Sequence, residues 1–185
     1  MTDIKSYKEI SEYFLADSRD FLARFNILLE KSLNGHIGMR SKLLIDLLFS
    51  AECCIKALIL FYLDCDKLPN KFFCHNINKL LSLLPSEEIE SCKKFLNETF
   101  IDFSIENRYM IETYKTFRSD RILDNNYYNT IANPKWLTDI SKELKELIGY
   151  VAKKVEQPIK VIKFSEIDIN SIQKSHIEKM NFRKK

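Results

Sequence analysis

The chain has 185 residues, of which 45% are apolar, and its formal net charge is +3. This length fits a single domain, or a domain with an appendage, and the apolar fraction is sufficient for a packed core. Only 3 Gly and 4 Pro are present, which argues against an all-β fold because tight turns depend on these residues. The small net charge neither requires nor excludes a nucleic-acid partner.

The first predicted helix covers residues 4–32 and ends at Asn34-Gly35, which is a helix stop signal. Apolar residues recur along this helix at spacings of three, four or their sum, so they share one face. They are Ile10, Phe14, Phe21, Phe25 and Leu28. We expect this face to pack on the core.

The second predicted helix, over residues 39–63, is apolar almost all round. Its apolar residues are Leu43, Leu44, Leu47, Leu48, Ala51, Cys54, Ile55, Leu58, Ile59 and Phe61. Such a helix is typically central and buried. Glu52 and Lys56 form an i,i+4 pair on its remaining polar strip.

Shorter helices are predicted next. Residues 75–84 form the third, and its inward residues are Ile77, Leu80, Leu81 and Leu84. A fourth helix begins with Ser86 as its N-cap and runs to about Phe100. A further helical stretch covers 105–117, and residues 118–133, which are polar and rich in Asn and Tyr, form a long loop.

The last core helix opens with Asn133 as its cap and Pro134 at its first position, and it must end before Pro158. Its apolar stripe consists of Leu137, Ile140, Leu144, Leu147, Ile148, Val151 and Val155. The pattern therefore predicts an all-α body over residues 1–156.

Residues 157–185 form a basic appendage. From Pro158 onward, seven basic residues face three acidic ones, so this segment carries +4 and the rest of the chain −1. The apolar residues Ile159 and Val161, and then Ile162 and Phe164, predict an extended segment that docks on the body or on a partner. A short helix over 171–180 follows.

The cysteine count bears on the compartment. The five cysteines are Cys53, Cys54, Cys65, Cys74 and Cys92. An odd number argues against a closed disulfide framework. The first ten residues lack the apolar core of a signal peptide, and no apolar run is long enough to span a membrane. These features predict a cytoplasmic protein without a membrane partner.

Three short motifs carry a family resemblance: Ala51-Glu52-Cys53-Cys54-Ile55-Lys56-Ala57-Leu58, then His75-Asn76-Ile77-Asn78-Lys79-Leu80, then Arg108-Tyr109. Their order over residues 5–156 resembles the HEPN superfamily. The resemblance implies an up-and-down bundle of about five helices that forms a homodimer. Many members are metal-independent ribonucleases of toxin–antitoxin, abortive-infection and CRISPR systems.

The family's ribonuclease motif, R-x4-6-H, is missing here. The histidines are His36, His75 and His176, and no arginine stands five to seven residues before any of them. In such a motif the arginine holds the scissile phosphate and the histidine moves a proton. The sequence therefore leaves open whether the chain is a metal-independent endoribonuclease.

The resemblance places a functional cleft near Arg108 and Tyr109. There Arg108 would bind a phosphate or nucleotide, while Tyr109 or Tyr114 would stack or donate a hydrogen bond. The alternative is structural: Arg108 pairs with a nearby glutamate such as Glu112, and Tyr109 belongs to the core.

A second candidate surface for nucleic acid lies in the predicted loop. Arg118, Arg121, Tyr127 and Tyr128 mix cations with aromatic rings, as single-strand binders do. The alternative is an ordinary solvated polar loop.

His75 is a candidate ligand or base, but a capping or packing role at the start of a helix is the simpler interpretation. Cys65, Cys74 and His75 do not match a zinc-ligand spacing, so no metal is expected. No phosphate loop or dinucleotide fingerprint is present, and no cofactor is expected.

Two functional classes remain. The preferred hypothesis is an RNA-related role in prokaryotic defence or toxin–antitoxin biology. The alternative is a non-catalytic helical adaptor that binds a nucleotide or a partner protein, with the appendage as the partner-binding element.

Overall fold

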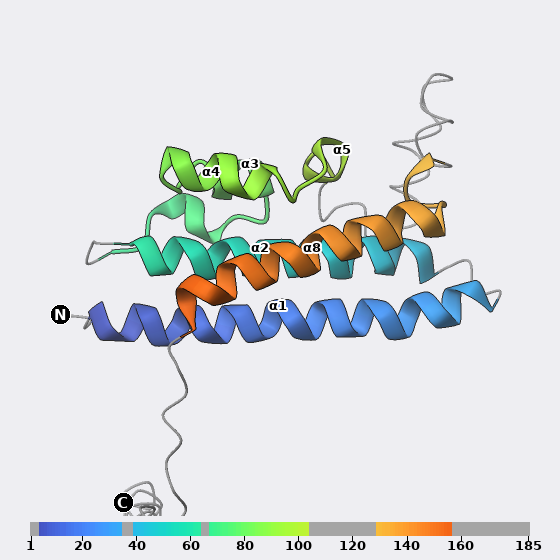
Figure 1. Cartoon of the computed structure of the whole chain (residues 1–185), viewed down its shortest axis with the longest axis horizontal. Coiled ribbons are helices and arrows are strands. Elements are labelled where there is room, and N and C mark those ends of the chain that lie inside the picture. Colours follow the sequence, from blue (N-terminus) through green and yellow to red (C-terminus); the bar gives the residue numbers. More distant parts are fainter. Residues whose placement is uncertain (1–3, 35–38, 64–66, 104–128, 157–185) are drawn as a thin grey trace, which may run out of the picture.

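The computed structural model of the chain describes residues 4–34, 39–63, 67–103 and 129–156 (Figure 1). Every regular element in these ranges is helical, and none of them is a strand. The elements are α1 (Ile4–Leu33), α2 (Arg40–Tyr62), the 3-10 helix η2 (Asn70–Phe73), α3 (Ile77–Leu81), α4 (Ser86–Lys93), α5 (Glu98–Ile101) and α8 (Pro134–Val155). The prediction of an all-α helical bundle is confirmed.

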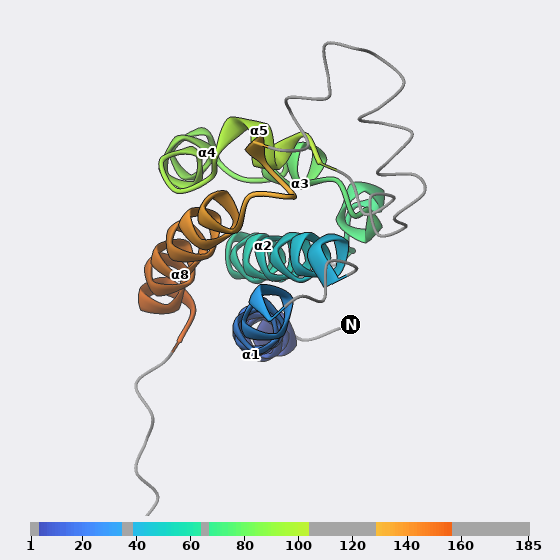
Figure 2. The ribbon, with the colours of Figure 1, turned by 90° about the vertical axis from the view of Figure 1, so that its right-hand side faces the viewer.

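The long helices α1, α2 and α8 form the frame of the bundle. α1 and α2 run antiparallel, and α8 crosses beside both of them (Figures 1 and 2). The short helices α3, α4 and α5 cover the side of α2 that faces away from α1. α2 therefore lies at the centre of the molecule, in contact with α1, α3 and α8.

Because α2 is the central helix, even its charged residues Glu52 and Lys56 are buried. Of the 23 residues of α2, 18 are buried, as its nearly continuous apolar pattern predicts. The predicted i,i+4 pair of Glu52 and Lys56 is confirmed, with 2.7 Å between its charged atoms, and both residues are buried, at 6% and 7% exposure. The pair is covered because other elements pack on α2 from several sides.

On α1 the buried face is rotated from the predicted one. Phe25 is fully buried, but Ile10 is 39% exposed. The buried row instead contains Leu15, Ser18 and Leu22. Ser18 fits there because its hydroxyl donates to a backbone carbonyl of α2 at 2.7 Å, which satisfies a polar group that would be costly to bury alone.

The predicted fourth helix is wrong in its length, because the chain breaks it into α4 and α5. The Asn97 side chain accepts a hydrogen bond from the Phe100 backbone N–H at 3.3 Å, which caps a new helix. Ser86 is the first helical residue of α4 rather than its cap; Pro85 takes that place, without a side-chain bond. The predicted third helix is also shorter, and Asn76 caps it.

The last helix follows its prediction closely. Asn133 accepts hydrogen bonds from the backbone N–H groups of Lys135 and Trp136 at 3.0 and 3.3 Å. Pro134 is the first helical residue, and the helix ends at Val155, before Pro158. All seven residues of the predicted apolar stripe are buried. None of the helices in the described ranges is both long and apolar enough to cross a membrane.

The four described cysteines are free thiols. Cys53, Cys54 and Cys92 are buried, and burial raises the pKa of Cys53 and Cys92 to about 12. Since the thiolate is the reactive form, these residues behave as small apolar side chains of the core.

Candidate acid–base site at Glu52 and His75

Two of the three motifs behind the family resemblance meet in space. Glu52 lies on α2, His75 lies two positions before the first residue of α3, and α3 packs on α2. The predicted capping role belongs to Asn76, whose side chain accepts from the Lys79 backbone N–H at 2.9 Å. His75 therefore stands outside the helix, and its ring turns back towards α2.

The Glu52 carboxylate holds the imidazole with both of its oxygens. His75 Nδ1 lies 3.1 Å from Glu52 Oε1 and 3.0 Å from Oε2. The Lys56 ammonium lies 2.7 Å from Oε1. The Glu52 side chain is 7% exposed, whereas that of His75 is 55% exposed. A buried carboxylate thus carries a ring that reaches solvent.

Aromatic side chains hold this group in place. The Phe49 ring meets the imidazole edge to face, with centroids 6.3 Å apart. The Lys56 ammonium lies 5.4 Å from the centre of the Phe72 ring, a cation–π distance. An apolar surrounding strengthens the attraction between charges because its effective dielectric constant is lower than that of water.

This geometry sets the tautomer of the imidazole. An ionised carboxylate only accepts hydrogen bonds, so Nδ1 of His75 carries a hydrogen and donates it to Glu52. Nε2, on the opposite edge of the ring, is then the basic nitrogen. Carboxylate–imidazole pairs of this kind orient general bases in enzymes. The arrangement can accept or release a proton at Nε2.

The predicted site residues lie outside the described part of the chain. They are Arg108, Tyr109, Tyr114, Arg118, Arg121, Tyr127 and Tyr128. The helix expected over 105–117 and the appendage over 157–185 lie outside it as well. These expectations remain predictions. His75 is the one histidine in the described ranges.

Cys65 lies outside the described ranges, so the expectation that Cys65, Cys74 and His75 bind no metal stays a prediction. Within the described ranges, no three His, Cys, Asp or Glu side chains gather closely enough to hold an ion. The Cys74 thiol lies 3.7 Å from the backbone oxygen of Asn76.

A second buried carboxylate, which the sequence did not point to, lies on α4. Glu88 accepts hydrogen bonds from the Tyr62 and Tyr150 hydroxyls and from the Lys154 ammonium, each at 2.8 Å. That ammonium also lies 5.7 and 5.0 Å from the centres of the two tyrosine rings. Glu88 thus joins α4 to the ends of α2 and α8.

The surroundings of Glu88 favour its charged form. Burial by itself would raise its pKa, but the hydrogen bonds from Lys154, Tyr150 and Tyr62 outweigh burial and hold the pKa below its ordinary value. The same contacts raise the pKa of Lys154. The sequence gives little indication of this cluster. Tyr150 and Lys154 share a helix face at i,i+4, but Tyr62 and Glu88 are distant from them in sequence.

Three comparisons with known proteins give no match: no family model matches the chain, no curated protein matches it, and no solved structure matches it. The family resemblance therefore remains a prediction from the motifs.

Proposed function

We propose that this chain acts on RNA, as a HEPN-like protein of prokaryotic defence or toxin–antitoxin systems, with His75 as its proton-transfer group. The observation that carries the proposal is the half-exposed His75 ring, which buried Glu52 orients through Nδ1. The order of the motifs on the chain supports the family, and the contact between two of these motifs is consistent with it.

The chemistry that fits this group is cleavage of RNA by its own 2′-hydroxyl. Nε2 of His75 would take the hydroxyl proton, the oxygen would attack the neighbouring phosphorus, and the bond from phosphorus to the 5′-oxygen would break. The leaving oxygen then takes up a proton. Histidine suits the first step because its ordinary pKa lies near neutral pH.

The phosphate needs a cation, and the resemblance assigns that role to Arg108. Related domains build the cleft from two copies, so the proposal includes a homodimer. The mass of the protein in solution tests this part separately.

The decisive experiment compares wild type with His75→Asn and Arg108→Ala on labelled total RNA and tRNA, with a chelator present. The amide of the introduced asparagine could still donate to Glu52, so His75→Asn tests loss of the proton-transfer group with little change in the fold. We expect the wild type to cleave and His75→Asn to lose about a hundredfold or more in rate. Asn78→Ala, on the exposed side of α3, is the matched control and should cleave like wild type.

Circular dichroism and melting must show that each variant is folded. Absence of cleavage by a folded wild-type protein at any concentration that populates a dimer would overturn the catalytic part. Cleavage that survives in His75→Asn would place the chemistry elsewhere.

A second function is favoured by a different contact. Lys56 also pairs with Glu52, so the cluster satisfies its own charges inside the fold, as a purely structural group would. In that case the chain is a non-catalytic adaptor that binds RNA, a nucleotide or a protein. RNA binding in a filter assay, unchanged by His75→Asn and without any cleavage, would favour this function.

A further inference from the structure

The outer side of α1 carries acidic residues that none of the described elements covers. Glu9, Glu12, Tyr13, Ala16 and Asp20 are all exposed and follow one another at helical spacings, so they form one strip. We call this surface the α1 acidic strip. Tyr13, at 73%, is the most exposed of the large apolar side chains in the described ranges.

The carboxylates of this strip have no charged partner among the described residues. Glu9, Glu12 and Asp20 form no ion pair there, although Lys8 is exposed nearby. Arg19, at the border of the strip, is already bound to Glu156. The strip is thus acidic around an aromatic centre.

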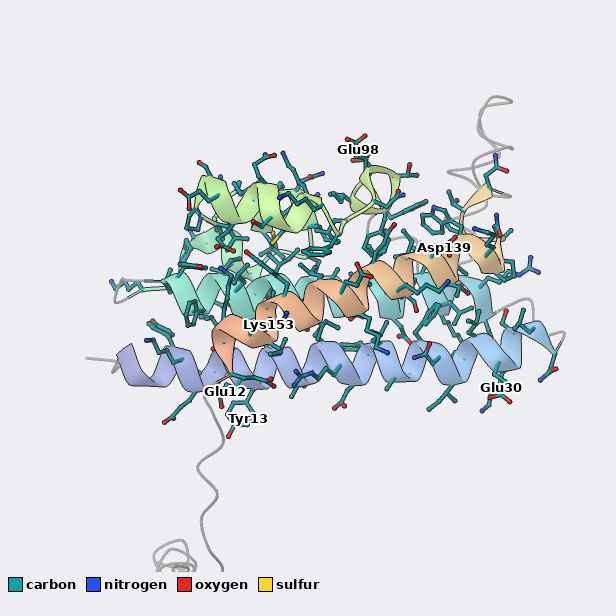
Figure 3. The ribbon with its side chains drawn as sticks, in the orientation of Figure 1. Glu12, Tyr13, Glu30, Glu98, Asp139 and Lys153 are labelled. Atoms are coloured by element: carbon teal, nitrogen blue, oxygen red, sulfur yellow. The ribbon has the colours of Figure 1, made fainter. Side chains whose placement is uncertain are left out.

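The end of α8 lies beside this strip. The Arg19–Glu156 ion pair fixes the last described residue against α1. α8 runs towards the N-terminal half of α1, and Glu12 and Tyr13 lie on α1 near the end of α8 (Figure 3). The chain that continues from Glu156 therefore starts next to the strip.

The next residues have the complementary chemistry. Lys160 and Lys163 stand in the otherwise apolar segment IKVIKF, with Val161 and Ile162 between them. We propose that residues 159–164 of this same chain lie along the α1 acidic strip, with Lys160 or Lys163 at its carboxylates.

The distances allow this contact. Seven helical residues, from Arg19 back to Glu12, span about 10 Å, and Glu9 lies about 15 Å from Arg19 along the axis. An extended chain covers about 3.3 Å per residue, so Lys160 reaches about 13 Å from Glu156 and Lys163 about 23 Å. Both lysines can therefore reach the strip without moving the bundle.

Zero-length coupling with a carbodiimide tests the contact in the full chain, because it joins a lysine to a carboxylate only when the two touch. We expect digestion and mass spectrometry to find Lys160 or Lys163 joined to Glu9, Glu12 or Asp20. A mixture of isotope-labelled and unlabelled protein shows which copy is bound. Coupling only between different copies, or only at other carboxylates, would overturn the proposal.

Chymotryptic cleavage after Phe164 provides a second measurement. The reversal pair Glu9→Lys with Glu12→Lys should speed this cleavage by about fivefold, since the exposed ion pairing with the segment is lost. Reversing Lys160→Glu and Lys163→Glu in the same protein should restore slow cleavage.

The matched control makes the same change in net charge as the Glu9/Glu12 pair, but at two residues outside the strip. Glu30→Lys with Glu98→Lys alters the far end of α1 and the opposite side of the molecule (Figure 3). This control should cleave like wild type. Equal cleavage rates in wild type and in the Glu9/Glu12 pair, with melting temperatures unchanged, would refute the docking.

Discussion

Two buried carboxylates of this molecule, Glu52 and Glu88, differ in their partners more than in their burial. They are 6% and 7% exposed, and each binds a lysine. Glu88 receives three donors from two other helices, and all three join elements of the fold. Glu52 receives a lysine from its own helix and the half-exposed ring of His75.

This difference in partners separates a cluster that only joins helices, at Glu88, from a cluster that could carry out chemistry, at Glu52. Burial makes both carboxylates dependent on partners. The donors of Glu88 are the hydroxyls of Tyr62 and Tyr150 and the ammonium of Lys154. The partner of Glu52 is instead an imidazole, and that ring reaches solvent. The partner, and not the burial, therefore identifies the candidate site.

The largest expected effect comes from removing Glu52. Glu52→Ala leaves the Lys56 ammonium buried without its carboxylate, and we expect the free energy of unfolding to fall by about 3 kcal/mol. Urea unfolding measures this loss. Glu90→Ala, an exposed helical glutamate, is the control and should change stability by about 0.5 kcal/mol or less. A loss as small as that of the control would show that Lys56 finds water or another partner.

A smaller loss is expected at Glu88. Glu88→Gln removes the charge from three donors, but the Lys154 side chain is 29% exposed and can turn to water. We expect a loss of about 2 kcal/mol in urea unfolding. Glu87→Gln, on the exposed side of the same helix turn, should be almost neutral. If Glu88→Gln lowers the free energy of unfolding more than Glu52→Ala does, the Glu88 cluster stabilises the fold more than the Glu52 cluster.

The smallest effect is a change in pH dependence. Because the pKa of Glu88 in the folded protein lies below its ordinary value of 4.5, its contribution is complete above that value and is lost as pH falls through the lower, folded pKa. On acidification, the free energy of unfolding of wild type should therefore fall more than that of Glu88→Gln. Urea unfolding between about pH 6 and about pH 3 measures how the free energy of unfolding of each protein changes with pH. If the free energy of unfolding falls equally with pH in wild type and in Glu88→Gln, the fold does not hold Glu88 in its charged form.

Predictions from the local sequence pattern were confirmed for features that depend on a single helix. Asn133 and Pro134 mark the start of α8, and its seven-residue stripe is buried as expected. The continuous apolar character of α2 likewise indicated the central helix. Capping bonds and helical spacing join residues a few positions apart, so the sequence displays them directly.

Predictions failed where packing between elements decides. Ile10 fits the apolar spacing of α1 but is exposed, while Ser18 is buried because it bonds to α2. The pair Glu52–Lys56 forms as its i,i+4 spacing predicts, but the sequence of one helix does not show that other elements cover the pair. The site residues expected between Arg108 and Tyr128 lie outside the described ranges and stay predictions.

The sequence by itself determined the all-helical class, the central place of α2 and the ends of α8, because helix signals and apolar periodicity are local. It also contained His75 and Glu52, but it did not join them. Only the tertiary structure brought the ring to a buried carboxylate 23 positions away in sequence and gathered Tyr62, Glu88 and Lys154 into one cluster. Such contacts depend on how helices pack against each other, and that packing is a property of the whole chain.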